Sequence, residues 1–258
     1  MKSSGLLRSS PAQYWHTAGE LDLAVTTCGA VPAMDVTRAV RAIGRVLRRH
    51  HLDAATRVRV TAPVDAEDPT VVQANIRSHG VATRVQVTGP GGFAVTFAAE
   101  RLDRQLARLA TAAARDWPDP ARPPLARVTG PRPIVRRKYC ALLTGTPAEA
   151  TAVMDAMDYD AYLFVDEATG ADAVVHWGDP LGVRLSRQCG APEHAAGTVN
   201  LLALTVDTEP APVLDEERAA GILCQRGLPF LFYTDEDHGR GQLLYRRYDG
   251  DLTLVGPA

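Results

Sequence analysis

An internal repeat in the C-terminal half constrains the fold more than any other feature of the sequence. The stretch Ala161-Tyr162-Leu163-Phe164-Val165-Asp166 returns as Pro229-Phe230-Leu231-Phe232-Tyr233-Thr234. A short helical pattern precedes each copy, and each is followed by an acidic turn ending in glycine, an apolar pair and a last alternating strand. Because such an order of elements rarely recurs by chance, the C-terminal half is predicted to hold two copies of a small α+β module.

The alignment of the copies fixes their expected bounds. We anchor Phe164 on Phe232. One extra residue in the second turn then lengthens the spacing by one and aligns the pairs Gly170/Gly239, Val175/Leu244, Val183/Leu252 and Leu185/Leu254. We therefore expect copy 1 at 134–187 and copy 2 at 200–258, with a linker at 188–199, and each copy is predicted to open with its own strand.

Charge divides the chain in two. Residues 1–145 hold 21 Lys+Arg and 11 Asp+Glu, whereas residues 146–258 hold 7 and 19. The net charges of +10 and −12 indicate different partners, a polyanion for the first part and a basic surface for the second. Of the 28 basic residues, 26 are Arg, whose planar fork suits phosphate better than Lys does.

The N-terminal part reads as one α+β domain at residues 20–115, after a flexible tail at 1–19. Alternating apolar residues predict strands near 21–26, 57–61, 71–77 and 82–87, the last two forming a hairpin. Apolar stripes predict helices from Pro32 to about 51 and from Phe93 to about 115. The expected fold is a β-α-β-β-β-α sandwich, with two helices on one face of a four-stranded sheet.

Arginine rows follow both predicted helices. A solvated face is the ordinary reading of such a row, but the first row contains no acidic residue. We expect the rows to merge into one basic surface, extended by a stiff proline-rich linker at 116–133. The candidate RNA-binding residues are Arg38, Arg41, Arg45, Arg48, Arg101, Arg104, Arg108, Arg122, Arg127 and Arg132.

Several other classes of protein are disfavoured. The four cysteines lie far apart without metal-site spacing, so we expect reduced thiols, no metal and no cofactor. No apolar run reaches the length of a spanning helix, and we expect a cytoplasmic protein. Acidic clusters occur at Asp158/Asp160, Asp166/Glu167 and Asp235-Glu236-Asp237-His238. They lie in turn-like stretches, where carboxylates are common for backbone reasons, so we expect no enzyme.

Three motifs give the chain a resemblance to a known family. Two are Pro69-Thr70-Val71-Val72-Gln73-Ala74-Asn75-Ile76 and Glu100-Arg101-Leu102-Asp103-Arg104-Gln105-Leu106, and the third is Tyr245-Arg246-Arg247-Tyr248-Asp249-Gly250. In this order they resemble the long ribosome hibernation-promoting factors, whose N-terminal domain has the S30AE fold. The tandem C-terminal copies are similar to the layout of the mycobacterial, hypoxia-induced branch. Copy 1 departs from the third motif, with Val175-His176-Trp177-Gly178-Asp179-Pro180 in its place.

The resemblance implies a function. The N-terminal domain would bind 16S rRNA in the mRNA and tRNA channel of the small subunit of the 70S ribosome and stop translation under stress by occupancy. The second-helix positions carried over are Arg101, Arg104 and Arg108. No membrane or DNA partner is implied, and the acidic half is expected to rest on basic ribosomal proteins. Two alternatives stay open: a general double-stranded-RNA-binding or RNA-chaperone protein, and an acidic protein-binding stress adaptor.

In the family, C-terminal modules on separate chains join two ribosomes into a 100S dimer. Here two modules lie on one chain, and a linker gives them a high effective concentration for each other. We therefore expect them to pair within the chain and to leave single 70S ribosomes. The expected pairing residues are Tyr162, Phe164, Val175, Phe230, Phe232, Leu244 and Tyr245.

Overall fold

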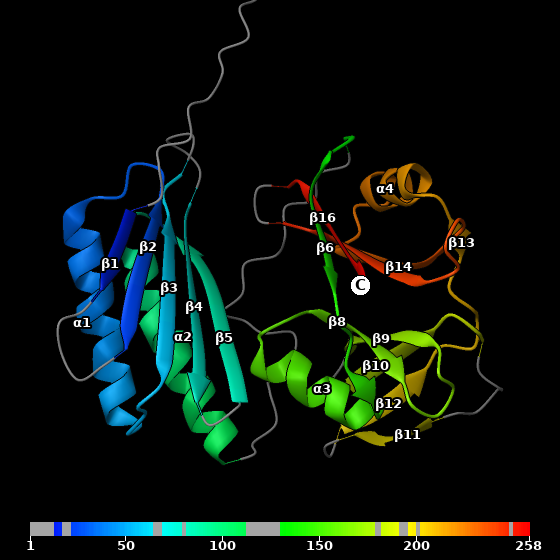
Figure 1. Cartoon of the computed structure of the whole chain (residues 1–258), viewed down its shortest axis with the longest axis horizontal. Coiled ribbons are helices and arrows are strands. Elements are labelled where there is room, and N and C mark those ends of the chain that lie inside the picture. Colours follow the sequence, from blue (N-terminus) through cyan, green and yellow to red (C-terminus); the bar gives the residue numbers. More distant parts are fainter. Residues whose placement is uncertain are drawn as a thin grey trace, which may run out of the picture. The chain divides into compact units, whose positions relative to one another are not determined.

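The chain forms two units, which we describe separately (Figure 1). They comprise Met1–Ala113 with Ala156–Asp158, and Ala114–Asp155 with Tyr159–Ala258. The computed structural model describes residues 13–16, 22–63, 69–78, 81–111, 130–178, 182–190, 196–199, 202–247 and 250–258. Within these ranges, no helix is long and apolar enough to cross a membrane.

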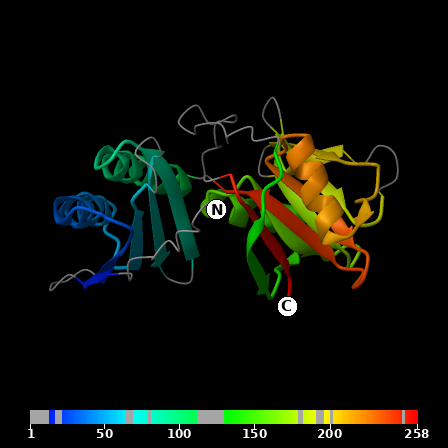
Figure 2. The same ribbon diagram turned by 90° about the horizontal axis from the view of Figure 1, so that it is seen from above.

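The first unit is a five-stranded sheet covered on one face by two helices, α1 (Ala33–Arg49) and α2 (Phe93–Ala110) (Figure 2). The strands are β1 (Gln13–His16), β2 (Leu23–Cys28), β3 (Ala55–Thr61), β4 (Thr70–Ser78) and β5 (Val81–Gly89), in that spatial order. β2 and β3 are parallel because α1 crosses between them, and β3, β4 and β5 form an antiparallel meander. The expected α+β sandwich is confirmed.

β1 adds a short edge strand to the four expected strands, and it lies within the range 1–19 that was expected to be a flexible tail. Its four residues pair antiparallel with β2, and Gln13 lies opposite Thr27. A strand at the edge of a sheet presents unpaired backbone groups, and β1 satisfies those on the outer side of β2.

The core of this unit lies between the sheet and the helices. Val36, Ile43 and Leu47 of α1 are buried there, as their spacing predicts. On α2 the stripe begins with small residues, Ala94, Val95 and Ala98, before it reaches Leu102. The apolar spacing of this helix predicts a buried stripe of Leu102, Leu106, Leu109 and Ala113. Leu102 is buried as predicted, Leu106 and Leu109 are only partly buried, and Ala113 lies outside the described residues.

The second unit contains two sheets. One has the order β11-β12-β10-β9-β8-β7 and the other the order β13-β14-β15-β16-β6. The strands of the first are β7 (Thr144–Gly145), β8 (Ala161–Asp166), β9 (Asp172–Gly178), β10 (Gly182–Arg187), β11 (Ala196–Val199) and β12 (Leu202–Val206). Those of the second are β6 (Ile134–Cys140), β13 (Val213–Leu214), β14 (Phe230–Asp235), β15 (Gly241–Arg246) and β16 (Leu252–Pro257).

The two copies exchange their first strands. β6 precedes copy 1 in sequence, yet it pairs in parallel with β16 of copy 2. β12 precedes the helix of copy 2, yet it pairs in parallel with β10 of copy 1. Each copy therefore completes the sheet of the other, instead of opening with its own strand.

Equivalent residues of the two copies are 69 positions apart in sequence throughout the repeat. Asp172 and Gly241 are one such pair. α3 (Pro147–Ala156) and α4 (Glu216–Gln225) begin and end at this spacing, and so do β8 and β14. Leu163 therefore corresponds to Phe232, and the alignment of Phe164 with Phe232 is wrong. The left-handed residues after the helices, Asp158 at φ 54° and Gly227 at φ 61°, obey the same spacing.

Each sheet carries its helix on one face and the other sheet on the opposite face. α3 packs on the first sheet through Ala150 and Met154, and α4 on the second through Ala219 and Leu223. A separate apolar cluster joins the two sheets and includes Leu163, Val174, Ala211, Phe232 and Leu243. The structure thus shows the two copies paired within one chain, in four layers.

Candidate nucleic-acid interface

A groove between α1 and α2 gathers most of the first arginine row. Its volume is about 540 Å³, and we name it the α1–α2 groove. Arg38, Arg41, Arg45 and Arg49 line it from α1, whereas Glu100 and Asp103 line it from α2. Three of the four arginines of the row therefore line a concave surface that also has carboxylates from α2.

Ion pairs occupy the two outer arginines of the groove. Arg38 Nη1 donates to Asp35 Oδ1 at 2.8 Å within α1, and Arg49 Nη1 donates to Asp103 Oδ2 of α2 at 2.6 Å. Asp103 Oδ1 also lies 2.8 Å from His50 Nε2, and this hydrogen bond, with Arg49, lowers the pKa of the Asp103 carboxyl. Asp103 thus joins α2 to the end of α1, and it leaves the middle of the row unpaired.

Arg41, Arg45 and Arg48 are exposed and have no carboxylate partner within the part of the chain that the structure describes. Arg48 lies on the same side of α1 but does not line the groove. Three adjacent guanidinium groups without a paired carboxylate favour a phosphate-bearing ligand, because each can bind a phosphate through two parallel hydrogen bonds.

The second arginine row does not merge with the first. Arg101 is 8% exposed, and its Nε and Nη2 donate to the two carboxylate oxygens of Asp158 at 3.1 and 2.7 Å. Arg108 Nη2 donates to Gln105 Oε1 at 2.9 Å. Of this row Arg104 is the exposed member, and it has no carboxylate partner among the described residues. The expected single basic surface is replaced by groove arginines on α1 and an isolated Arg104 on α2.

The linker arginines add little to this picture. Arg122 and Arg127 lie outside the described residues. Arg132 is exposed, with Nη1 3.9 Å from Asp251 Oδ1. Arg132 therefore belongs to the second unit, and its role in RNA binding stays a prediction.

A second basic surface was missed in the sequence. Arg57 and Arg59 of β3 and Arg77 of β4 are exposed on the face of the sheet that the helices leave uncovered. Arg57 pairs with Asp22 at 2.8 Å. The sequence contained a pattern that could have predicted this surface. Arg57 and Arg59 alternate with the buried Val58 and Val60 of β3, which places both arginines on the opposite face of the strand.

Exposed apolar side chains lie at the start of both helices. Phe93 and Phe97, one turn apart on α2, are 65% and 41% exposed, and Met34 of α1 is 69% exposed. A Cβ added at Gly89 would approach the Phe97 ring to 2.9 Å, so the ring rests on a glycine backbone. An exposed aromatic ring is suited to stacking on unpaired bases.

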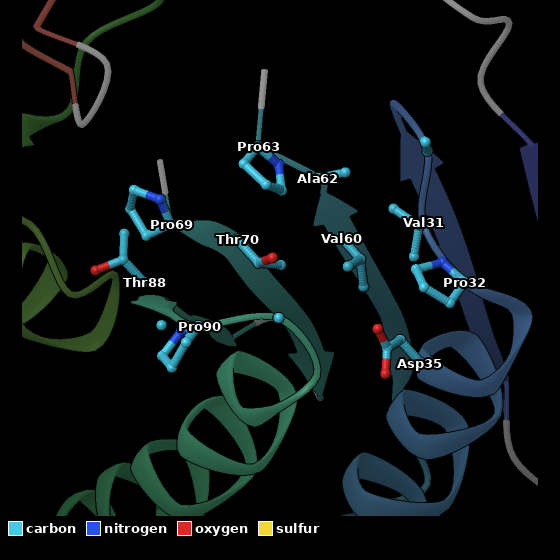
Figure 3. A pocket seen from close by; sticks show the side chains of 13 residues that line it. Val31, Pro32, Asp35, Val60, Ala62, Pro63, Pro69, Thr70, Thr88 and Pro90 are labelled. Atoms are coloured by element: carbon cyan, nitrogen blue, oxygen red, sulfur yellow. The ribbon is translucent and has the colours of Figure 1, made fainter. Parts of the chain in front are cut away.

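A hollow of about 490 Å³ opens where α1 and α2 begin (Figure 3). Pro32 and Asp35 form one wall, Val60 and Pro63 lie at the end of β3, and Pro90 stands before α2. Among its described lining residues only Asp35 is ionisable, and Asp35 pairs with Arg38. The described walls of the hollow are small and mostly apolar, and they do not bring together two ionisable side chains that could act as a general acid and a general base.

Two of the three acidic clusters contain a carboxylate that accepts from a backbone turn, whereas Asp158 of the first cluster binds Arg101. Asp166 Oδ1 accepts from the Ala168 N–H, and Asp235 Oδ1 accepts from the N–H groups of Asp237 and His238. Within the described ranges no three metal-ligating side chains come together.

The expected pairing residues of the two copies divide by strand face. Phe230 and Phe232 lie in the cluster between the sheets. Tyr162, Phe164 and Val175 face α3 instead, and Leu244 faces α4, so these four are wrong. Tyr245 contacts β6, where Lys138 Nζ donates to its hydroxyl at 3.0 Å. The residues missed are Leu163, Val174, Ala211 and Leu243.

With this geometry in view, comparison with known proteins places the chain. It is 42% identical over 249 residues to the dormancy associated translation inhibitor of two Mycobacterium tuberculosis strains, H37Rv and CDC 1551 / Oshkosh. The match covers 92% of this chain and 88% of each relative. The chain belongs to the S30AE family of ribosome hibernation factors.

Two further comparisons bear on parts of the chain. Residues 129–185 match the family model described as Sigma 54 modulation/S30EA ribosomal protein C terminus. The match with the N-terminal domain of Thermus thermophilus Protein Y covers 30% of this chain and 84% of that one, at 16% identity and a TM-score of 0.26. The range matched by the family model begins before β6 and ends within β10, so it spans the sequence of copy 1 but takes its strands from two different sheets.

Proposed function

We propose that this S30AE family member inhibits translation by binding 16S rRNA in the mRNA and tRNA channel of the small ribosomal subunit. The observation that carries the proposal is the row of exposed arginines Arg41, Arg45 and Arg48, which have no carboxylate partner in the described structure. Binding is by occupancy: the guanidinium groups hold phosphates, and Phe93 and Phe97 are placed to stack on unpaired bases.

Charge reversal on the helices and on the sheet tests the assignment. In one variant Arg41, Arg45 and Arg48 are changed to Glu, and in the matched variant Arg57, Arg59 and Arg77 are changed to Glu. Both change the net charge equally, so a difference between them reports the face that binds RNA. We expect the helix variant to lose co-sedimentation with 70S ribosomes and the sheet variant to retain it. The reverse result would contradict the assignment.

Competition with free RNA separates this function from general RNA binding. A factor that fits the channel should stay on 30S subunits when duplex RNA is added in excess. A general double-stranded-RNA-binding protein would instead be drawn off by the duplex.

We further propose that the factor holds single 70S ribosomes and does not join them into dimers. The support is that β6 and β12 are exchanged within one chain and that the sheet faces bury each other. That surface is then closed to a module on a second ribosome. The acidic part of the chain, residues 146–258, is proposed to rest on basic ribosomal proteins.

Sucrose-gradient profiles of ribosomes with added protein test this outcome. We expect a 70S peak that contains the factor. A 100S peak that depends on the factor would overturn the proposal.

A further inference from the structure

Asp172 of copy 1 and Gly241 of copy 2 are equivalent positions of the repeat, and they touch each other. A Cβ placed on Gly241 would lie 2.5 Å from the Asp172 Cβ. Equivalent residues of a pair related by pseudo-twofold symmetry meet only near its axis. The contact therefore marks the axis between the two copies, and the axis has room for one side chain.

The side chain at the axis is a buried carboxylate that the other copy binds. Asp172 is 2% exposed. Its Oδ2 accepts from the Gly241 N–H at 2.7 Å and from Arg240 Nε at 2.8 Å, and its Oδ1 accepts from Arg240 Nη2 at 3.0 Å. A buried charge is tolerated because these charge-assisted bonds compensate it.

A second polar residue strengthens the contact from the copy 1 side. Gln188 Oε1 accepts from the Asp172 N–H at 3.1 Å. Its Nε2 donates across the interface to Gly239 O at 2.9 Å and to Thr234 Oγ1 at 3.3 Å.

The Asp, Arg and Gln side chains of this contact each occur on one copy only. At the positions equivalent to Asp172, Arg240 and Gln188 stand Gly241, Ala171 and Pro257. Two copy 1 modules would bring Asp172 against Asp172, with alanine in place of the arginine. Two copy 2 modules would leave glycine against glycine and two arginines without a carboxylate. Like charges at an interface are repulsive, and a buried unpaired charge is also costly.

We propose that Asp172, Gly241 and Arg240 determine the pairing specificity of the tandem modules, so that copy 1 accepts copy 2 and either copy rejects its own kind. The partner that this surface fits is the unlike module. This inference rests on the proposed function, because pairing within one chain matters biologically only if the factor holds single 70S ribosomes. The pairing itself is a property of the free protein. Its failure is therefore visible without ribosomes.

Two single substitutions in the full chain imitate the contact that two identical copies would make at the axis. Gly241→Asp reproduces the carboxylate pair of two copy 1 modules, and Asp172→Gly reproduces the empty axis of two copy 2 modules. Hydrogen exchange of β9 and β15 peptides reports opening of the interface. We expect exchange about tenfold faster in Asp172→Gly, which loses its ion pair, and about a hundredfold faster in Gly241→Asp.

The double variant Asp172→Gly with Gly241→Asp decides the matter. It again places one carboxylate opposite one glycine, but Ala171 of copy 1 stands where an arginine would have to bind a carboxylate at position 241. We therefore expect exchange to slow from about a hundredfold to about tenfold the wild-type rate, the level of Asp172→Gly. The Phe232 ring, 2.9 Å from a Cβ at position 241, is disturbed equally in both variants, and its effect cancels. The control pairs Gly241→Asp with Asp166→Asn, which alters a buried carboxylate bound by Arg187 within copy 1. This control should show no recovery.

Two results would overturn the proposal. One is wild-type exchange in Gly241→Asp, which would mean that the axis accepts two carboxylates. The other is a double variant that exchanges as fast as Gly241→Asp or faster, since the two positions would then act independently.

Discussion

Single residues in the two copies perform the same task with different chemistry. Trp177 of copy 1 is the repeat equivalent of Arg246, at the place where copy 1 lacks the Tyr-Arg-Arg motif. Trp177 Nε1 donates to Tyr159 O at 2.9 Å, and Arg246 Nε donates to Leu228 O at 3.4 Å. The two acceptors are also equivalent positions, each just after the helix of its copy. An indole therefore replaces the guanidinium as the donor that holds the helix end to the sheet.

Replacing Trp177 by Phe tests this role. The substitution keeps an aromatic ring but removes the indole N–H that donates to the Tyr159 carbonyl, which should cost about 0.5–1.5 kcal/mol of stability. Urea unfolding of the full chain measures the loss. Tyr162→Phe is the matched control, because no hydrogen bond to the Tyr162 hydroxyl is found in the described structure. Equal stability of Trp177→Phe and wild type would show that the hydrogen bond contributes nothing.

At the scale of elements, the register of the repeat decides which residues pair the copies. Side chains of a strand alternate between two faces, so a shift by one residue moves every side chain to the other face. Aligning Phe164 with Phe232 assigned Phe164 to the interface, whereas the structure has Leu163 there. Helix and strand positions were predictable from apolar periodicity. The face was not, because both faces of β8 are buried and apolar.

Strand exchange predicts effects far from a substitution in sequence. Ile134 of β6 packs on the core of copy 2, next to Leu252, although it precedes copy 1. Ile134→Ala should lower the stability of copy 2 by roughly 1–2 kcal/mol, less than for a fully buried site because Ile134 is only partly buried. Hydrogen exchange should therefore rise in α4 and β16, while α3 keeps its protection.

The neighbouring residue provides the control for this prediction. Val135 is 51% exposed on the same strand, so Val135→Ala should leave exchange in copy 2 near the wild-type rate. Faster exchange in α3 than in α4 after Ile134→Ala would indicate that β6 supports copy 1 instead.

At the scale of the whole molecule, charge segregation should govern the salt dependence of ribosome binding. The first unit has Arg41, Arg45, Arg48 and Arg104 exposed without carboxylate partners in the described ranges. If each of them neutralises one phosphate, affinity should fall roughly a hundredfold between about 50 and about 200 mM salt. Co-sedimentation across a salt series measures the slope. Binding that survives high salt would contradict phosphate contacts by these arginines as the main source of affinity.

The sequence alone determined the order and type of the helices and of most strands, the duplication and the separation of charge, because periodicity, turn residues and charge are local properties of the chain. It also carried the motifs that placed the chain in its family. Only the tertiary structure decided which arginines keep a free guanidinium, since Asp158 and Asp103 come from distant positions to pair with Arg101 and Arg49. It likewise decided the strand exchange and the contact of Asp172 with Gly241. Both features join residues that lie far apart in the sequence, and local sequence patterns do not predict such long-range contacts.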